Sequence, residues 1–117
     1  MFSSSSSSGL WIGRRGCLEA FDNFVKEFFE EKSVKGEVLQ KAESAAESLI
    51  TDADKASADM YIKTMRKIIE KGTDFVATEV KRVDKLRSGK VSDKKKEQLG
   101  DRLNVLNTFQ IRLNDEL

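Results

Sequence analysis

The sequence predicts an all-α fold: a compact five-helix bundle preceded by a disordered N-terminal arm. The chain has no proline and only seven glycines among 117 residues, so residues that break helices are sparse. Beyond residue 16, apolar side chains recur at the spacing of one helix face. The stretches between these periodic segments are only a few residues long. Short connections favour neighbouring helices that pack antiparallel around one core.

Residues 1–16 form a low-complexity arm without helical or strand periodicity, and we expect them to be disordered. A secretory signal needs a basic start followed by roughly seven or more apolar residues. Here the only apolar triplet is at residues 10–12, and both arginines of the arm follow it. The serine-rich, acid-free composition weakly matches an organelle transit peptide. The alternative that we favour is an artefact of truncation, gene prediction or cloning.

The first predicted helix carries a dense phenylalanine stripe. Such a stripe is typical of a core, where replacing a phenylalanine by alanine costs about 3–5 kcal/mol. The functional alternative is an exposed patch that grips a partner or an unfolded chain. The residues with helical spacing are Leu18, Phe21, Phe24, Val25, Phe28 and Phe29.

The second predicted helix has small side chains through its middle, which would let another helix approach closely. Ser33 can serve as its N-cap, and the periodicity weakens again near residues 51–54. Either Asp52 or Asp54 is a suitable N-cap for the following helix, since an acid also suits the positive end of a helix. The apolar positions of this second helix are Val34, Val38, Ala42, Ala45, Ala46 and Leu49.

The third predicted helix is the one around which the others are organised, and Gly72 ends it as a left-handed cap after Lys71. Polar residues occupy its other faces. Because an amphipathic helix cannot bury its apolar stripe alone, the flanking helices must cover it. The stripe consists of Tyr61, Ile62, Met65, Ile68 and Ile69.

Two further helices follow, with Thr73 and Ser92 as their predicted caps and Gly89 as a second glycine stop between them. The lysine run at residues 94–96 has the composition of a site for phosphate or an acidic partner. Asp93 and Glu97 flank it, which favours a solvated helix face instead. The predicted core positions are Phe75, Val76, Val80, Val83 and Leu86 in the fourth helix, and Leu99, Leu103, Leu106 and Phe109 in the fifth.

The composition argues against several classes of function. Lys and Arg total 21 against 20 for Asp and Glu, so a net charge of +1 gives no broad field for binding nucleic acid. Histidine is absent and Cys17 is the only cysteine, which removes Ser-His-Asp triads, histidine-containing zinc sites and a Cys-x-x-Cys pair. No apolar run approaches the roughly 20 residues of a membrane span. We therefore expect no enzyme activity, no cofactor, no metal and no nucleic-acid partner.

The last four residues, Asn114, Asp115, Glu116 and Leu117, form an ER-retention-like tail. They differ only at the first position from the Lys-Asp-Glu-Leu and His-Asp-Glu-Leu endings that address proteins to the endoplasmic reticulum. Carboxylates and one apolar side chain on a flexible end are groups that a basic receptor pocket can grip. A chance acidic ending is the alternative.

Residues 61–75 and 89–109, together with the opening at residues 16–22, carry a resemblance to a known family. They resemble the C-terminal helical domain of the endoplasmic reticulum protein 29 and Windbeutel family, also called the D domain in some plant and fungal protein disulfide isomerases. The resemblance implies a five-helix domain at residues 17–113, between the arm at residues 1–16 and the tail at residues 114–117. In the family this domain follows a thioredoxin-like domain, which this sequence lacks.

The resemblance implies a non-catalytic protein-binding module of the endoplasmic reticulum lumen that assists the folding or transport of secretory proteins. Its partners would be secretory client proteins and the receptor that retrieves escaped lumenal proteins. The alternative function is a structural or assembly domain that positions a partner subunit without binding clients. Cys17 is expected to be a free thiol rather than part of a bridge between chains. Residues carried over as candidates for protein binding or core are Tyr61, Met65, Phe75, Leu86, Leu99, Leu103 and Phe109.

Overall fold

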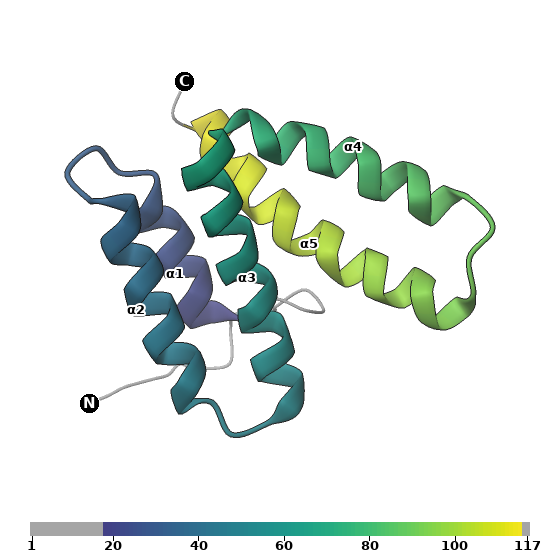
Figure 1. Cartoon of the computed structure of the whole chain (residues 1–117), viewed down its shortest axis with the longest axis horizontal. Coiled ribbons are helices and arrows are strands. Elements are labelled where there is room, and N and C mark those ends of the chain that lie inside the picture. Colours follow the sequence, from purple (N-terminus) through teal and green to yellow (C-terminus); the bar gives the residue numbers. More distant parts are fainter. Residues whose placement is uncertain (1–17, 116–117) are drawn as a thin grey trace.

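The structure is a computed structural model that describes residues 18–115. Within these residues it contains five helices and no strand, which confirms the predicted all-α fold class. Figure 1 shows that consecutive helices alternate in direction, as short connections require. The helices are α1 (Glu19–Phe28), α2 (Lys35–Ser48), α3 (Asp52–Lys71), α4 (Asp74–Ser88) and α5 (Asp93–Asp115).

The helices form two groups that meet at the centre of the fold. α1, α2 and α3 pack as a three-helix group, while α4 and α5 form a long hairpin that extends away from it (Figure 1). The hairpin is attached through the start of α4, which packs against α3, and through the C-terminal half of α5, which contacts α1 and α3. α3 packs against α2, α4 and α5, and its Tyr61 ring also meets Phe21 of α1, which agrees with the central position predicted for this helix.

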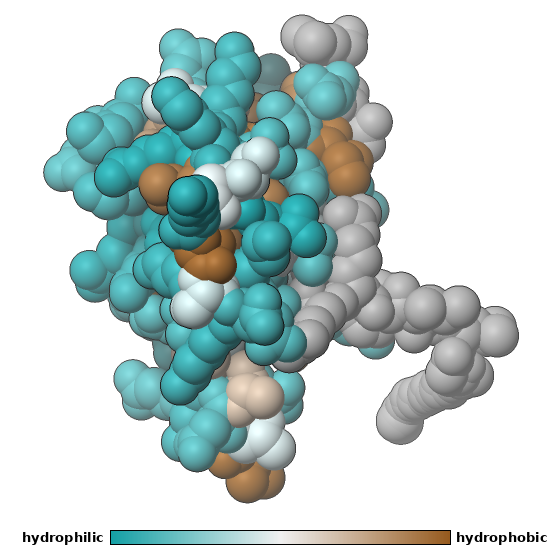
Figure 2. Space-filling model, turned by 90° about the vertical axis from the view of Figure 1, so that its right-hand side faces the viewer, coloured by the Kyte–Doolittle hydropathy of each residue, from teal (hydrophilic) through white to brown (hydrophobic). Residues whose placement is uncertain are grey.

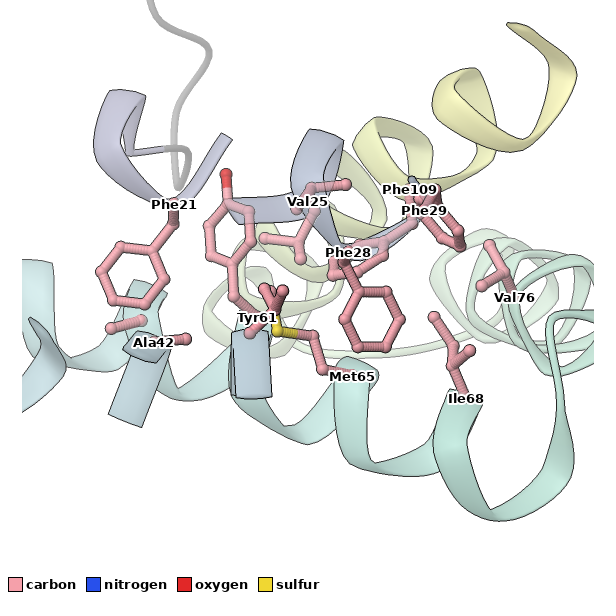
Figure 3. Packing of buried hydrophobic residues seen from close by; sticks show 13 residues of the cluster. Phe21, Val25, Phe28, Phe29, Ala42, Tyr61, Met65, Ile68, Val76 and Phe109 are labelled. Atoms are coloured by element: carbon pink, nitrogen blue, oxygen red, sulfur yellow. The ribbon is translucent and has the colours of Figure 1, made fainter. Parts of the chain in front are cut away.

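The main core is built around aromatic rings from three helices (Figure 3). The ring of Tyr61 in α3 lies 5.5 Å from that of Phe21 in α1 and 6.1 Å from that of Phe109 in α5. Phe28 and Phe29 meet Phe109 edge to face, at 6.3 and 6.0 Å between ring centroids. Edge-to-face pairs place the positive rim of one ring on the negative face of the other. The phenylalanine stripe of α1 is therefore core, as predicted, with Phe24 only partly buried.

A second, smaller apolar cluster holds the hairpin together. Val83 of α4 packs there with three leucines of α5, Leu99, Leu103 and Leu106. Val80 contacts both this cluster and the main core. The apolar stripes of α4 and α5 are thus buried partly against each other, and only the stretch near Val76 and Phe109 reaches the centre of the bundle.

The helix starts differ from several predicted caps. α3 is capped by Thr51, whose Oγ1 accepts a hydrogen bond from the Asp54 N–H at 3.2 Å, so the prediction of Asp52 or Asp54 was wrong. The two acids lie in the first turn instead, where the helix dipole favours them. Ser33 is not the cap of α2, because the helix begins one residue later, after Val34. Ser92 does cap α5, accepting from the Lys95 N–H at 3.3 Å.

The two glycine stops are not alike. Gly72 has φ +103° and donates its N–H to Ile68 O at 2.6 Å, which confirms a cap with positive φ. Gly89 follows the last residue of α4 as predicted, but its φ of −81° is open to any residue. The chain there leaves the helix in an extended conformation, so the prediction of a second left-handed cap was wrong.

The buried stripe of α3 is narrower than predicted. Ile69 is 46% exposed, whereas Thr64 is buried and donates its hydroxyl to Met60 O at 2.8 Å. Adjacent helical residues point about 100° apart. With Met65 and Ile68 facing the centre of the core, Ile69 is turned towards the molecular surface.

α5 extends past the predicted end of the domain, since Asn114 and Asp115 lie in its last turn. The rest of the tail, the N-terminal arm and Cys17 lie outside the described residues. No helix in residues 18–115 is both long enough and apolar enough to cross a membrane.

Candidate functional site

Five of the seven candidate residues are core side chains. Tyr61, Met65 and Phe109 are completely buried at the centre of the main core (Figure 3). Leu99 and Leu103 are buried in the second cluster, inside the hairpin. A partner could not reach Tyr61, Met65 or Phe109 without unfolding the domain, so their role is to hold the helices in place. Leu99 and Leu103 are mostly buried, but each also lines the floor of a surface depression on the hairpin.

The other two candidates reach the surface at separate places. Phe75, in the first turn of α4, is partly buried against the main core and lines a surface groove. Leu86 is 47% exposed near the far end of the same helix. The structure therefore does not bring the seven residues together as one site, and Phe75 is the member that points to one.

The groove runs along the outer face of α3, between α2 on one side and the start of α4 on the other. It has a volume of about 690 Å³ and is open to solvent along its length. Its apolar contributors come from three helices, Leu39 of α2, Ile69 of α3 and Phe75 of α4. The complete lining is Leu39, Lys63, Thr64, Arg66, Lys67, Ile69, Glu70, Phe75 and Arg102.

Cations dominate the lining of this α3 groove, and three of them are ion-paired, one within α3 itself and two to other helices. Lys63 Nζ lies 3.2 Å from Asp59 Oδ2, and Arg66 Nη2 lies 3.1 Å from Glu43 Oε2 of α2. Lys67 has no ion-pair partner within the described part of the chain. These side chains are more than half exposed where paired, so water screens the pairs strongly.

Arg102 closes the groove on the side of the hairpin. Its Nη2 lies 3.0 Å from Glu79 Oε2, and Glu79 is a largely buried carboxylate of α4. This pair joins α4 to α5 beside the groove. Because a buried carboxylate needs a partner, the contact fixes Arg102 in position more firmly than an exposed pair would.

A second surface groove lies on the hairpin but has mixed charge. It has a volume of about 780 Å³ and is formed by α4 and α5. Lys96 contributes to it, together with acids such as Asp84, Asp93 and Glu97. The lysine run at residues 94–96 is exposed and lies among these acids, which is the arrangement of a solvated helix face.

Outside these grooves, the described surface is mainly hydrophilic. Figure 2 shows the face at the right of Figure 1, where hydrophobic groups are small and separated by polar ones. The large apolar side chains that are most exposed are single ones, including Ile50 at 91% and Val34 at 58%. Scattered side chains of this kind are ordinary on a protein surface. The α3 groove differs in combining three apolar side chains with a row of charges.

The chemistry available in the α3 groove is non-covalent. Its side chains can donate hydrogen bonds through ammonium and guanidinium groups and can bury apolar surface. Among residues 18–115, no group of three or more Cys, Asp or Glu side chains is arranged to hold a metal ion. Thr64, the only hydroxyl in the lining, is bonded to the backbone of its own helix.

Two of the groove residues belong to pairs of adjacent apolar residues, a pattern that marks one member of each pair as a surface residue. Val38–Leu39 and Ile68–Ile69 are pairs of adjacent apolar residues on helices. Because neighbours on a helix point about 100° apart, only one member of each pair can face the core centre. Val38 and Ile68 are buried, which leaves Leu39 and Ile69 at the groove.

The tail residues lie at the end of the hairpin's second helix. Asn114 is exposed in the last turn of α5. Asp115 closes that helix, and Glu116 and Leu117 lie outside the described residues. The terminal sequence therefore follows directly from a helix whose Leu113 packs against the main core.

Comparison with known proteins finds several relatives that match most of this chain. The chain is 34% identical over 108 residues to the protein windbeutel of Drosophila melanogaster, covering 92% of this chain and 42% of windbeutel. It is 35% identical over 96 residues to protein disulfide-isomerase 1 of Dictyostelium discoideum, covering 81% of this chain and 26% of that protein. A probable protein disulfide-isomerase A6 of Medicago sativa is 29% identical over 110 residues, or 91% of this chain and 29% of the relative.

The chain thus spans less than half the length of these curated relatives, which makes it comparable to one part of each of them. That part is defined by the family match. Residues 16–109, which include nearly all of the five helices, match the family described as endoplasmic reticulum protein ERp29, C-terminal domain. The helical fold, the relatives and this match agree, and the chain belongs to the family of the ERp29 C-terminal domain.

Proposed function

We propose that the chain is a non-catalytic protein-binding module of the endoplasmic reticulum lumen, which holds segments of secretory proteins as they fold or travel. The observation that carries the proposal is the α3 groove. There, Leu39, Ile69 and Phe75 present apolar surface beside a row of cations, in a domain of the ERp29 family.

The groove suits an unfolded or partly folded polypeptide better than a small reactant. It is open and lined by flexible charged side chains, whereas small-molecule sites are usually enclosed and mainly apolar. An unfolded segment offers both apolar side chains and backbone groups. The apolar side chains of the segment can cover Ile69 and its neighbours. Its backbone carbonyl groups can accept hydrogen bonds from the cations of the rim.

The tail supports the proposed compartment. Residues 114–117 end in Asp-Glu-Leu, the part shared by the usual retrieval endings. A retrieval receptor would be the corresponding partner. The exposed position of Asn114 at the end of α5 agrees with access to that receptor. Tagging upstream of Asn114, with the terminus left intact, should give a lumenal signal, and a cytosolic signal would contradict this part of the proposal.

The binding proposal is tested with the 117-residue chain and a reduced, alkylated secretory protein carrying a fluorescent label. We expect fluorescence anisotropy to rise as the chain is added, with saturation at micromolar concentrations. The matched variants are Ile69→Ser in the groove and Leu86→Ser on the hairpin, both on exposed side chains. Ile69→Ser should weaken binding, while Leu86→Ser should leave it unchanged.

Absence of binding by a chain whose circular dichroism confirms its helices would overturn the proposal. If light scattering then showed a stable self-assembly, a structural or assembly domain would be the better description.

A further inference from the structure

We propose that the far end of the α4–α5 hairpin binds the surface of membranes that contain anionic phospholipids. This end, the basic tip, comprises residues 81–96, which form the last half of α4, the connection and the first turn of α5. The proposal is independent of the function proposed above, because the basic tip and the α3 groove have no residue in common.

The charges of the molecule are segregated, although its net charge is only +1. Residues 81–96 carry eight lysines and arginines and only two aspartates, a net charge of +6. Residues 18–80, which make up α1 to α3 and the first half of α4, carry 14 acids against nine basic residues, a net charge of −5. An anionic surface is therefore attracted to the basic tip and repelled by the rest of the domain, which orients the molecule with its tip towards that surface.

The positive charge of the tip is exposed and is not neutralised by ion pairs. All eight cations are exposed, and none of them forms an ion pair among residues 18–115. By contrast, Lys63, Arg66 and Arg102 of the α3 groove are each paired with a carboxylate. An unpaired cation keeps its full attraction for an approaching anion, since no adjacent carboxylate offsets its charge.

The acids near the tip are gathered in one place. All four carboxylates of residues 81–101 line the groove between α4 and α5. Three of the eight cations line the same groove, so the charges there nearly balance. The other five lie outside it, although Lys95 shares a smaller depression with Asp101. These five cations carry the excess positive charge of the tip, and they are Arg82, Lys85, Lys90, Lys94 and Lys95.

The position and the apolar content of the tip suit a flat, extended partner. The tip is the end of the hairpin that extends away from the three-helix group, so a planar surface can approach it without meeting the other helices (Figure 1). Leu86 is 47% exposed there, and Val91 is half-buried. Figure 2 views the molecule from the side of the tip and shows apolar groups standing among hydrophilic ones. Basic side chains around a few apolar ones are typical of segments that lie on membranes, where the apolar side chains enter the headgroup region.

The predominance of lysine favours lipid headgroups over an acidic protein segment. Four of the five cations outside the groove are lysines. Arginine binds a carboxylate in a fixed, bidentate geometry, whereas a lysine acts as a mobile point charge. Clusters of about four to eight lysines and arginines bind anionic lipid surfaces through their summed charge. Arg82, Lys85, Lys90 and Lys94 lie outside both the groove and the depression that holds Lys95, so they offer charge without a shaped pocket.

Co-sedimentation of the 117-residue chain with lipid vesicles tests the proposal. Vesicles of phosphatidylcholine that contain about one third phosphatidylserine should bind the chain, and vesicles of phosphatidylcholine alone should not. Exposed charges are screened over about 8–10 Å at physiological ionic strength and over shorter distances as salt is added. Raising the salt concentration should therefore release the bound chain.

Two matched double variants locate the contact. Lys85→Glu combined with Lys94→Glu should lower the affinity for the phosphatidylserine vesicles by at least about tenfold, because it reverses two charges of the tip. Lys26→Glu combined with Lys55→Glu makes the same change in net charge on α1 and α3, and should lower the affinity far less. All four side chains are exposed, so both variants should keep their helices, which circular dichroism checks.

Equal binding to the two kinds of vesicle, or equal losses for the two double variants, would overturn the inference. If polyglutamate bound the chain as tightly as the phosphatidylserine vesicles, and the tip variant lost this binding, the partner would be an acidic protein segment. That result would also overturn the inference. The function proposed above is measured separately, since the tip variant should still bind the unfolded secretory protein.

Discussion

At the scale of single residues, Tyr61 connects the parts of the core. It lies on α3, it is fully buried, and its ring packs between Phe21 of α1 and Phe109 of α5. Its hydroxyl accepts a hydrogen bond from the Leu18 N–H at 3.2 Å, at the residue preceding α1. One side chain thus joins the middle of the fold to the start of its first helix.

Replacing Tyr61 by phenylalanine keeps the ring but removes this acceptor. We expect the free energy of unfolding to fall by about 1 kcal/mol, the net value of one hydrogen bond with a neutral partner. The loss should be local, with faster amide hydrogen exchange at Leu18. Urea denaturation and exchange measured by NMR check the two effects. Unchanged exchange at Leu18 would show that the bond does not hold the start of α1.

Removing the ring of Phe109 should cost much more. Phe109 is fully buried and contacts aromatic rings of α1 and α3, so Phe109→Ala leaves a cavity between helices. The expected loss in the free energy of unfolding is about 3–5 kcal/mol. Ile111→Ala, on the same helix but 45% exposed, is the control and should lose far less. Similar urea midpoints for the two variants would contradict the assigned core.

At the scale of elements, the sequence predicted the five helices but not the details of their ends. Periodicity identified each helix because core contacts repeat along a whole face. A cap depends on one or two backbone angles and one hydrogen bond, and several neighbouring residues are chemically suitable. Thr51, Asp52 and Asp54 could all cap α3 on chemistry alone, and the chain path selects Thr51.

The threonines that precede α3 and α4 allow the stability contribution of a cap hydrogen bond to be tested. Thr51 accepts a hydrogen bond from Asp54 N, whereas Thr73, the residue before α4, forms no side-chain cap bond. Thr51→Ala should lower the free energy of unfolding by about 1 kcal/mol, and Thr73→Ala should lower it by clearly less. Thermal and urea denaturation measure both. A larger loss for Thr73→Ala would contradict the assigned caps.

The candidate site was less predictable than the helices. The family resemblance offers Tyr61, Met65 and Phe109 as candidates for protein binding or core, and because their side chains are large and apolar the fold buries all three. The groove depends on which residues of three separate helices meet, and periodicity within one helix does not contain that information. Ile69 illustrates this, since the sequence pattern assigned it to the buried stripe.

At the scale of the whole molecule, the two apolar clusters should differ in stability. The main core joins α1, α2 and α3 to the nearer parts of α4 and α5, whereas the second cluster has only four buried residues. Segments with few buried contacts open locally at lower free energy than the core. The far end of the hairpin, around Leu86 and Val91, should therefore open first.

Native-state hydrogen exchange tests this order. Amides at residues 84–97 should exchange faster than those at residues 58–68 of α3, and only the α3 amides should approach the free energy of global unfolding. Residues near the helix ends exchange quickly in any protein, so the comparison is made at mid-helix positions. Equal protection in the hairpin and in α3 would show that the five helices unfold as one unit.

In the proposed function, this helical domain holds polypeptide segments in the groove over α3. The most direct measurement is an NMR titration of the ¹⁵N-labelled chain with a peptide from the reduced, alkylated secretory protein. We predict chemical-shift changes concentrated at residues 63–70, with further changes at Leu39 and Phe75. Changes confined to the hairpin groove between α4 and α5, or no changes at saturating peptide, would contradict the claim.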